Sequence, residues 1–170
     1  MESFSAFPPL VGENPDILVL GTFPSPLSRE RGEYYGNPRN MFWRIICDVF
    51  ANGVYAADYG DRKNIIYSRG VAVWDVIERC RVEGALDKNI KDPAFNHSLP
   101  DFIRTHGIKK VLFNGRMAHT FYMRGIGTAD GDAVMFETLP STSPANAGMR
   151  YEEKLSAWKT ALSTKTPTYS

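Results

Sequence analysis

The sequence has 170 residues, most simply one domain that is large enough to bury a core. Hydrophobic residues make up 43% and charged residues 23%, as in an ordinary globular protein, and no apolar run approaches the roughly 18 residues that span a bilayer. The formal net charge is only +1, so the overall charge gives no support to nucleic-acid binding, which often needs a basic excess.

Apolar runs and helical spacing predict the elements in chain order. Residues 17–20 form an apolar run stopped by Gly21, which indicates a strand buried on both faces. Apolar residues from Phe42 onward recur at helical spacing, and Asn37 or Asn40 is expected to cap that helix. Residues 82–98 look irregular. Further strands are expected within residues 71–77, 109–115 and 133–140, and further helices over 61–68, 99–107, 116–126 and 151–162.

This alternation of strands and helices predicts an α/β fold with a mainly parallel sheet. Ligands of such sheets bind beyond the carboxyl ends of the strands. Three polar loops are expected there, at residues 21–40, 114–116 and 141–150. Asp75, at the end of a predicted strand, either orients a site residue or caps the following helix, and the cap is favoured.

Cysteine and histidine content argues against the common metal sites. Cys47 and Cys80 are the only cysteines, and both fall in apolar segments where buried free thiols are expected. The three histidines show no metal-ligand spacing. We therefore expect no metal and no cofactor. Because the N-terminus lacks a signal-peptide pattern, a cytoplasmic location is expected.

Two of the polar loops carry motifs of a known family. The segments "GTFPSPLSRERGEYYGNPRNMFW" and "LPSTSPAN" resemble the two signature segments of the uracil-DNA glycosylase superfamily. The form "GNPRNMFW" is most similar to its sixth family, the hypoxanthine-DNA (deoxyinosine) glycosylases. The element order agrees along most of the chain, although only these two segments are specific. The resemblance implies a three-layer α/β/α sandwich, one glycosylase domain over residues 1–170, and metal-independent excision of a deaminated base from DNA.

The sequence departs from its relatives at two positions. Phe23 stands where the mismatch-specific branch has a catalytic asparagine, and Ser141 stands where the classical uracil enzymes have a histidine. Both changes argue against ordinary uracil chemistry, so the catalytic polar group is expected elsewhere in the loops.

Asn37 is the predicted catalytic residue. Glycosidic cleavage passes through an oxocarbenium-like transition state, which a well-placed water can attack. An amide oxygen holds such a water without being a strong base. Asn40 is the alternative, and either asparagine also suits a turn or a helix cap.

Three residues are expected to bind the base. The resemblance implies that Tyr35 stacks on the extruded base, while a core position is the alternative. The Asn114 amide offers a donor and an acceptor to hypoxanthine O6 and N1–H, or simply turns the chain before Gly115. Phe23 either walls the pocket or belongs to the core.

The remaining loop residues are expected to contact DNA. Hydroxyls and nearby backbone N–H groups of the second segment suit phosphates. Relatives use the end of this segment to fill the space of the vacated base, and arginines flank the loops. These expected DNA-binding residues are Arg39, Arg116, Ser141, Thr142, Ser143, Pro144, Ala145 and Asn146.

The expected activity is monofunctional hydrolysis, because no lysine lies in the site loops to form a Schiff base. The substrate is expected to be double-stranded DNA, with single-stranded DNA as an alternative, and the expected state is a monomer. The alternatives are a uracil or mismatched-thymine glycosylase and a non-catalytic DNA-binding module on the same fold.

Overall fold

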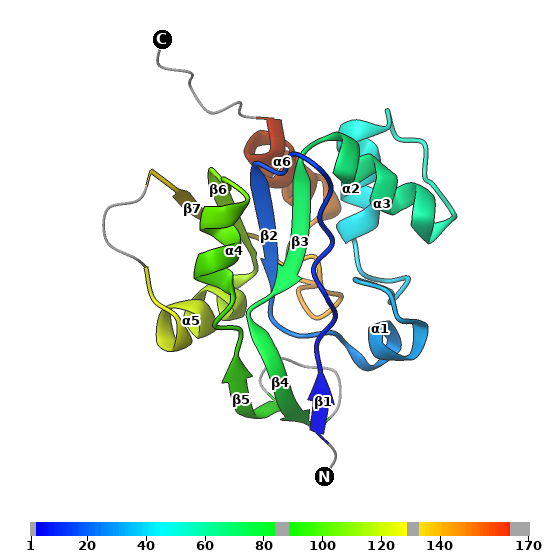
Figure 1. Cartoon of the computed structure of the whole chain (residues 1–170). Helices are drawn as coiled ribbons and strands as arrows, with labels where there is room; N and C mark the ends of the chain where they lie inside the picture. Colours follow the sequence, from blue (N-terminus) through cyan, green and yellow to red (C-terminus); the bar gives the residue numbers. More distant parts are fainter. Residues whose placement is uncertain (1–2, 84–88, 129–132, 164–170) are drawn as a thin grey trace.

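The computed structural model describes residues 3–83, 89–128 and 133–163, and a parallel sheet forms its centre (Figure 1). Four strands pair in the order β3-β2-β6-β7, and every neighbouring pair is parallel. They are β2 (Ile17–Gly21), β3 (Val71–Asp75), β6 (Lys110–Asn114) and β7 (Met135–Leu139). The predicted α/β class and mainly parallel sheet are confirmed.

Helices cover both faces of this sheet, which gives three layers (Figure 1). One face packs against α2 (Phe42–Phe50), α3 (Tyr59–Ser68) and α6 (Tyr151–Ser163). The other face packs against α4 (Leu99–Thr105) and α5 (Arg116–Gly125). Residues of β2 alternate between the two cores: Ile17 and Val19 lie in the first, Leu18 and Leu20 in the second. The continuous apolar run at 17–20 is explained by this burial on both faces.

A second, antiparallel sheet extends from the first. It contains β1 (Ser3–Ser5), β4 (Ile77–Val82) and β5 (Ile90–Phe95), in the order β1-β4-β5. The prediction of an irregular stretch at 82–98 is therefore wrong over β5. Pro93 and the polar residues of β5 are unusual in a central strand, but an edge strand tolerates them. Residues 84–88 of that stretch lie outside the described residues.

A single residue, Val76, separates β3 from β4. Its N–H donates to the Gly21 carbonyl at 2.9 Å, and the Ile77 N–H donates to the Thr22 carbonyl at 3.1 Å. The strand expected within 71–77 thus ends at Asp75, and the chain passes directly into the other sheet.

A short helix, α1 (Pro26–Arg31), lies within the segment predicted as a loop. Ser25 begins it, because its Oγ accepts the Ser28 N–H at 3.2 Å. Gly32 ends it in the left-handed conformation, with φ of 67°. Six residues are too few for helical spacing to be detected in the sequence.

Aromatic residues anchor the first motif in the core. Phe42, Trp43 and Trp158 are buried, and the Phe42 ring centroid lies 4.9 Å from that of Trp43 and 6.0 Å from that of Trp158. The Trp43 Nε1–H donates to the Tyr34 carbonyl at 2.7 Å. Cys47 and Cys80 are buried free thiols, as predicted.

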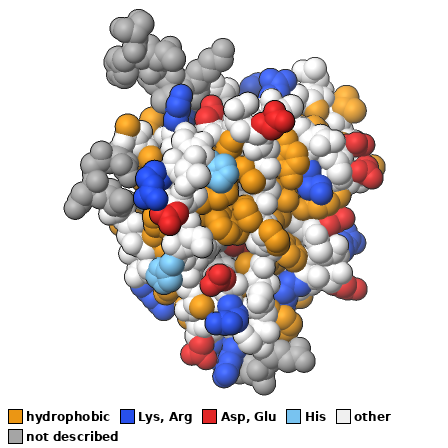
Figure 2. All heavy atoms as spheres, in the orientation of Figure 1, with side chains coloured by type: hydrophobic (Ala, Val, Ile, Leu, Met, Phe, Trp, Pro, Cys, Tyr) orange, Lys and Arg blue, Asp and Glu red, His pale blue; other side chains and the backbone are white. Residues whose placement is uncertain are grey.

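No helix within residues 3–83, 89–128 and 133–163 is long and apolar enough to cross a membrane. Acidic and basic side chains are interspersed on the face shown in Figure 2.

Candidate active site

A cleft of about 1100 Å³ opens at the carboxyl ends of β2 and β6. The strand order reverses there, because β3 pairs with one side of β2 and β6 with the other. Such a reversal is where open parallel sheets bind ligands. Residues from all three predicted polar loops line this cleft, so the sequence located it correctly.

The first motif is held in place by α1. The Gly36 N–H donates to Ser28 Oγ at 2.9 Å, and Arg31 Nη1 donates to the Gly36 carbonyl at 2.9 Å. Ser28 is buried. Both polar groups of the Gly36 residue are thereby satisfied, which fixes the backbone immediately before Asn37. No local pattern in the sequence indicates this role of Ser28 and Arg31.

Asn37 and Asn40 are half-buried, and both line the cleft. Asn37 Oδ1 accepts the Arg39 N–H at 3.0 Å, and Asn40 Oδ1 accepts the Phe42 N–H at 2.9 Å. Asn40 therefore satisfies a donor in the first turn of α2. Each amide oxygen has a second lone pair that can accept a hydrogen bond from water.

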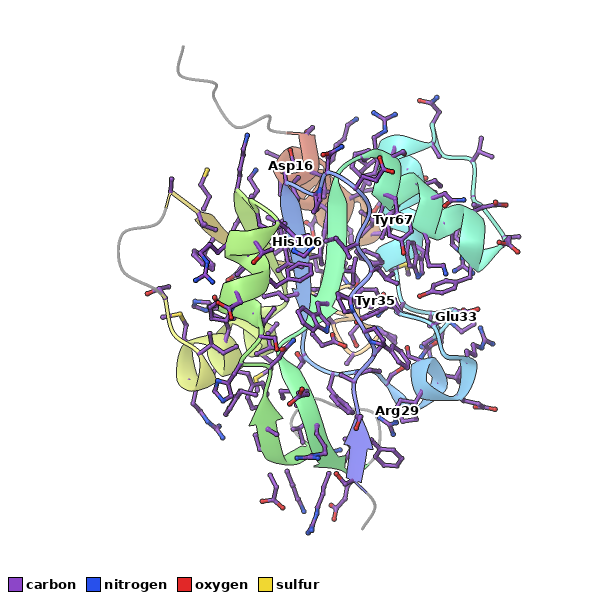
Figure 3. All side chains as sticks on the ribbon, in the orientation of Figure 1. Asp16, Arg29, Glu33, Tyr35, Tyr67 and His106 are labelled. Carbon is purple, nitrogen blue, oxygen red and sulfur yellow. The ribbon has the colours of Figure 1, made fainter. Side chains whose placement is uncertain are left out.

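The two adjacent tyrosines point in different directions. Tyr34 is 3% exposed, and its phenol donates to the Pro8 carbonyl at 2.8 Å, so it belongs to the core. Burial raises the pKa of Tyr34, and the negative charge of Asp75 raises it further. Tyr35 is half-buried and lines the cleft, beside the carboxyl end of β3 (Figure 3).

The Tyr35 ring is packed on one side. Its centroid lies 4.3 Å from that of Phe42, and its backbone has φ of 53°. A left-handed φ is uncommon outside glycine and often marks a functional position. Phe42 thus supports the ring of a residue that lines the cleft.

Asp75 lines the cleft, although orientation of a site residue was only the less favoured of its two expected roles. Its side chain is on the cleft wall, only 3% of the residue is exposed, and it pairs in register with Gly21. The favoured interpretation, a cap for a following helix, is wrong because β4 follows. The sequence signal that could have assigned Asp75 to the site was its position, as a carboxylate at the carboxyl end of a predicted strand.

Asn114 connects β6 to the second motif. Its Nδ2 donates to Thr142 Oγ1 at 2.9 Å, and its Oδ1 accepts the Thr142 N–H at 2.9 Å. One amide hydrogen and one lone pair of Asn114 are left over for another partner. Thr142 has no exposed surface, and its carbonyl accepts the Met41 N–H at 3.0 Å. The hydroxyl of Thr142 is thus turned inward, and a DNA contact through it finds no support.

The second motif is folded on itself. Ser141 Oγ accepts the Ser143 N–H at 3.2 Å, and Ser143 Oγ accepts the Ala145 N–H at 3.2 Å. Asn146 Nδ2 donates to the Ser141 carbonyl at 3.2 Å, and Lys154 Nζ donates to the Asn146 carbonyl at 2.8 Å. Pro144 and Ala145 lie at the outer turn of this loop, where Ala145 is exposed.

Charge on the cleft is divided between rim and interior. Arg39 and Arg116 are exposed lining residues, whereas Asp75 is the only acidic residue among the described residues that line the cleft. Phe23 is half-buried; it lines the cleft and also packs against the core on the α4 and α5 side. In the described part of the chain, no group of three or more His, Cys, Asp or Glu side chains is arranged to hold a metal ion.

Comparison with known proteins gives consistent matches over most of the chain. The profile of the Uracil DNA glycosylase superfamily matches residues 8–164. A protein of Methanosarcina barkeri strain Fusaro, named hypoxanthine DNA glycosylase, is 30% identical over 159 residues, which are 92% of this chain and 96% of that protein. A protein of the same name from Methanosarcina acetivorans is 32% identical over 146 residues, with 82% and 86% of the two chains covered.

A solved structure has the same fold. It is a solution NMR structure from Methanosarcina acetivorans, described as that of a candidate uracil DNA glycosylase. The TM-score is 0.75 at 28% identity, and the alignment covers 95% of this chain and 97% of the other.

Proposed function

Because the chain belongs to the uracil DNA glycosylase superfamily, we propose that it is a monofunctional DNA glycosylase that hydrolyses the N-glycosidic bond of deoxyinosine and releases hypoxanthine. One domain carries the activity. The observation that carries this proposal is the cleft of about 1100 Å³, which the Tyr35 ring and the Asn37 amide both line. That volume is sufficient for an extruded purine nucleotide.

Base recognition begins when the nucleotide leaves the stack. The Tyr35 ring stacks on the purine while Phe42 supports the ring, and stacking of this kind contributes about 1–3 kcal/mol per base. The remaining amide hydrogen of Asn114 can donate to hypoxanthine O6, and its remaining lone pair can accept from N1–H. Adenine lacks both features, since deamination creates them.

Bond cleavage then follows from charge and water placement. The C1′–N9 bond breaks, the purine leaves with the electron pair, and the sugar becomes an oxocarbenium ion. Asn37 Oδ1 accepts a hydrogen bond from a water, whose oxygen adds to C1′. One proton of that water stays on the new hydroxyl group, and the other passes to the departing base or to solvent. A weak acceptor suffices, because the cation is already formed when the water attacks.

The rim of the cleft would hold the DNA backbone. Arg39 and Arg116 are exposed and can contact phosphates on either side of the extruded nucleotide. Ser141 and Ser143 shape the second motif, so that Ala145 and Asn146 fill the vacated space in the duplex. The proposed substrate is double-stranded DNA, and the proposed state is a monomer.

A base-release assay tests the proposal. Duplexes that carry a single inosine, uracil or xanthine are incubated with the protein, and abasic sites are cleaved by alkali. We expect release from the inosine duplex, with Asn37→Ala slower by about 10²–10³-fold, the scale on which loss of one preorganised hydrogen-bonding group slows catalysis. DNA affinity, measured by fluorescence anisotropy, is expected to be retained in Asn37→Ala. The matched control is Asn64→Ala, on the exposed face of α3.

Two outcomes would contradict the proposal. Rapid uracil release with inosine left intact would make the protein a uracil glycosylase, the activity named for the NMR structure; the absence of an amide at Phe23 argues against it. Binding of inosine DNA without release of any base would indicate a non-catalytic module on the same fold.

A further inference from the structure

The inner end of the cleft contains a carboxylate with a fixed position. Asp75 ends β3, pairs in register with Gly21 of β2, and is 3% exposed. Its carbonyl accepts from Asn96 Nδ2 at 3.1 Å, and the next residue, Val76, donates its N–H to the Gly21 carbonyl. The peptide group that follows Asp75 is thus held by two hydrogen bonds, which fix the backbone from which the carboxylate projects.

The phenol of Tyr35 reaches the same place. A Cβ atom built on Gly21 would lie 2.6 Å from Asp75 Oδ1 and 2.9 Å from the Tyr35 hydroxyl oxygen. These two oxygens therefore converge over Gly21, in space that only a glycine leaves open. Tyr35 has a left-handed backbone, with φ of 53°.

We propose that Asp75 is a positioning residue that accepts the phenol proton of Tyr35 and holds the ring in the orientation that stacks on the extruded base. This inference rests on the proposed function, because it explains how the Tyr35 ring is held in the orientation that stacks on the base. A carboxylate can only accept, and a phenol donates, so the pair is chemically matched. Hydrogen bonds to an ionised acceptor are about twice as strong as neutral ones.

The consequence is a preorganised stacking surface. Phe42 supports the ring from behind, and Asp75 fixes its far end, so that both side-chain torsions of Tyr35 are determined before DNA arrives. A site that is fixed in advance loses less entropy on binding and places the reacting bond more accurately. Misplacement of the ring would also shift C1′ relative to Asn37.

Single-turnover excision with a double-mutant cycle tests the inference. Tyr35→Phe keeps the stacking ring and removes the donor; Asp75→Ala removes the acceptor. Each is expected to lower the single-turnover rate by about tenfold, and the double variant is expected to lose no more than either alone, because both changes break one interaction. Asp75→Asn retains an acceptor oxygen and is expected to recover most of the rate.

Matched controls separate this effect from general damage. Tyr55→Phe removes an exposed phenol, and Asp101→Asn removes an exposed carboxylate on α4. Both are expected to behave as the wild type. A wild-type rate for Tyr35→Phe, or losses that multiply in the double variant, would overturn the inference; if Asp75→Ala does not fold, Tyr35→Phe and Asp75→Asn still decide it.

A second readout is independent of catalysis. In protein with ¹³C-labelled tyrosine rings and no DNA, Asp75→Ala is expected to shift the Tyr35 ring signals and to average them by faster ring flips. Unchanged Tyr35 signals would overturn the positioning role even if the wild type excises hypoxanthine. Conversely, a wild type that releases no base contradicts the proposed function. The Tyr35 ring signals would still report whether Asp75 holds the ring in place.

Discussion

Asn37 and Asn40 are three residues apart, and the side-chain amide oxygen of each accepts a hydrogen bond from a backbone N–H. The two hydrogen bonds differ in the part of the structure that they stabilise. The Asn40 bond satisfies Phe42 at the start of α2, whereas the Asn37 bond closes an exposed turn at Arg39. Helix stability therefore depends on Asn40. Asn37 is therefore the asparagine that we propose for the chemistry.

Substitution of these two asparagines is expected to separate stability from activity. The N-cap position of α2 is Met41 and not Asn40. Asn40→Ala should still lower the free energy of unfolding by about 1 kcal/mol, because it removes the acceptor of the Phe42 N–H. Asn37→Ala should change stability less and excision far more. Urea unfolding and single-turnover excision measure the two effects. If Asn40→Ala abolished excision without altering stability, Asn40 would be the residue that holds the water.

The close packing around Gly21 also leads to a testable prediction. A methyl group there would press on Asp75 Oδ1 at 2.6 Å and on the Tyr35 hydroxyl at 2.9 Å. We expect Gly21→Ala to destabilise the fold by roughly 1–3 kcal/mol, typical of an overpacked interior, and to slow excision. Gly148→Ala is the control, since nothing lies within 4 Å of its added Cβ. Equal thermal unfolding midpoints for the two variants would contradict the close approach.

At the scale of elements, Thr142 joins three parts of the site. It binds Asn114 at the end of β6 through two hydrogen bonds, and its carbonyl accepts from Met41 beside α2. The second motif is therefore fixed to the sheet and to the first motif, although it was expected to be a DNA-contacting loop.

Thr142→Val tests this connection. Valine has the same shape but leaves the buried Asn114 amide short of one acceptor, which should cost about 1–3 kcal/mol of unfolding free energy. Excision should fall with it, because Asn114 loses its fixed orientation. Thr160→Val, on the exposed face of α6, is expected to stay within about 0.5 kcal/mol of the wild type. A neutral Thr142→Val would mean that the Asn114 amide finds another acceptor.

The sequence located the central elements because their patterns are local. The buried run of β2, the apolar spacing of α2 and the strand before Asn114 each carry their own signal. By contrast, β5 and α1 depend on distant partners: β5 pairs with β4, and Ser28 of α1 holds Gly36. Nothing in the local sequence reveals such contacts.

The same reason explains what was missed at the site. The place of Asp75 could be predicted from the end of a strand, but its environment could not, because β4 follows where a helix was expected. Likewise, the inward orientation of Thr142 and the left-handed backbone of Tyr35 arise from tertiary packing. The motifs in the sequence predict which residues gather at the cleft. Only the structure shows which of these side chains point inward and which lie at the rim of the cleft.

At the scale of the molecule, DNA affinity must come from placement of charge rather than from its amount. The net charge is +1, and Figure 2 shows both signs interspersed on the visible face. The two exposed arginines of the cleft are thus expected to account for much of the salt dependence of binding.

Arg39→Ala and Arg116→Ala are each expected to weaken DNA binding regardless of sequence. Each lost phosphate contact should also reduce the slope of log K against log salt concentration by about 0.9. Anisotropy titrations between low and moderate salt measure this slope. Arg104→Ala is the control, because Arg104 lies on α4 and pairs with Asp101 at 2.8 Å. An unchanged slope in both cleft variants would place the phosphates elsewhere.

The one-residue passage between the two sheets restricts how this chain can vary in length. Val76 and Ile77 donate their N–H groups to the carbonyls of Gly21 and Thr22. An inserted or deleted residue at this passage would therefore rotate the Asp75 carboxylate away from the Tyr35 phenol. It would also shift β4 out of register with the strands beside it. Length changes are better tolerated at surface turns such as the one that carries Val54 and Tyr55, which are 71% and 55% exposed. Comparisons or redesigns of this enzyme should therefore treat the spacing from Asp75 to Ile77 as invariant.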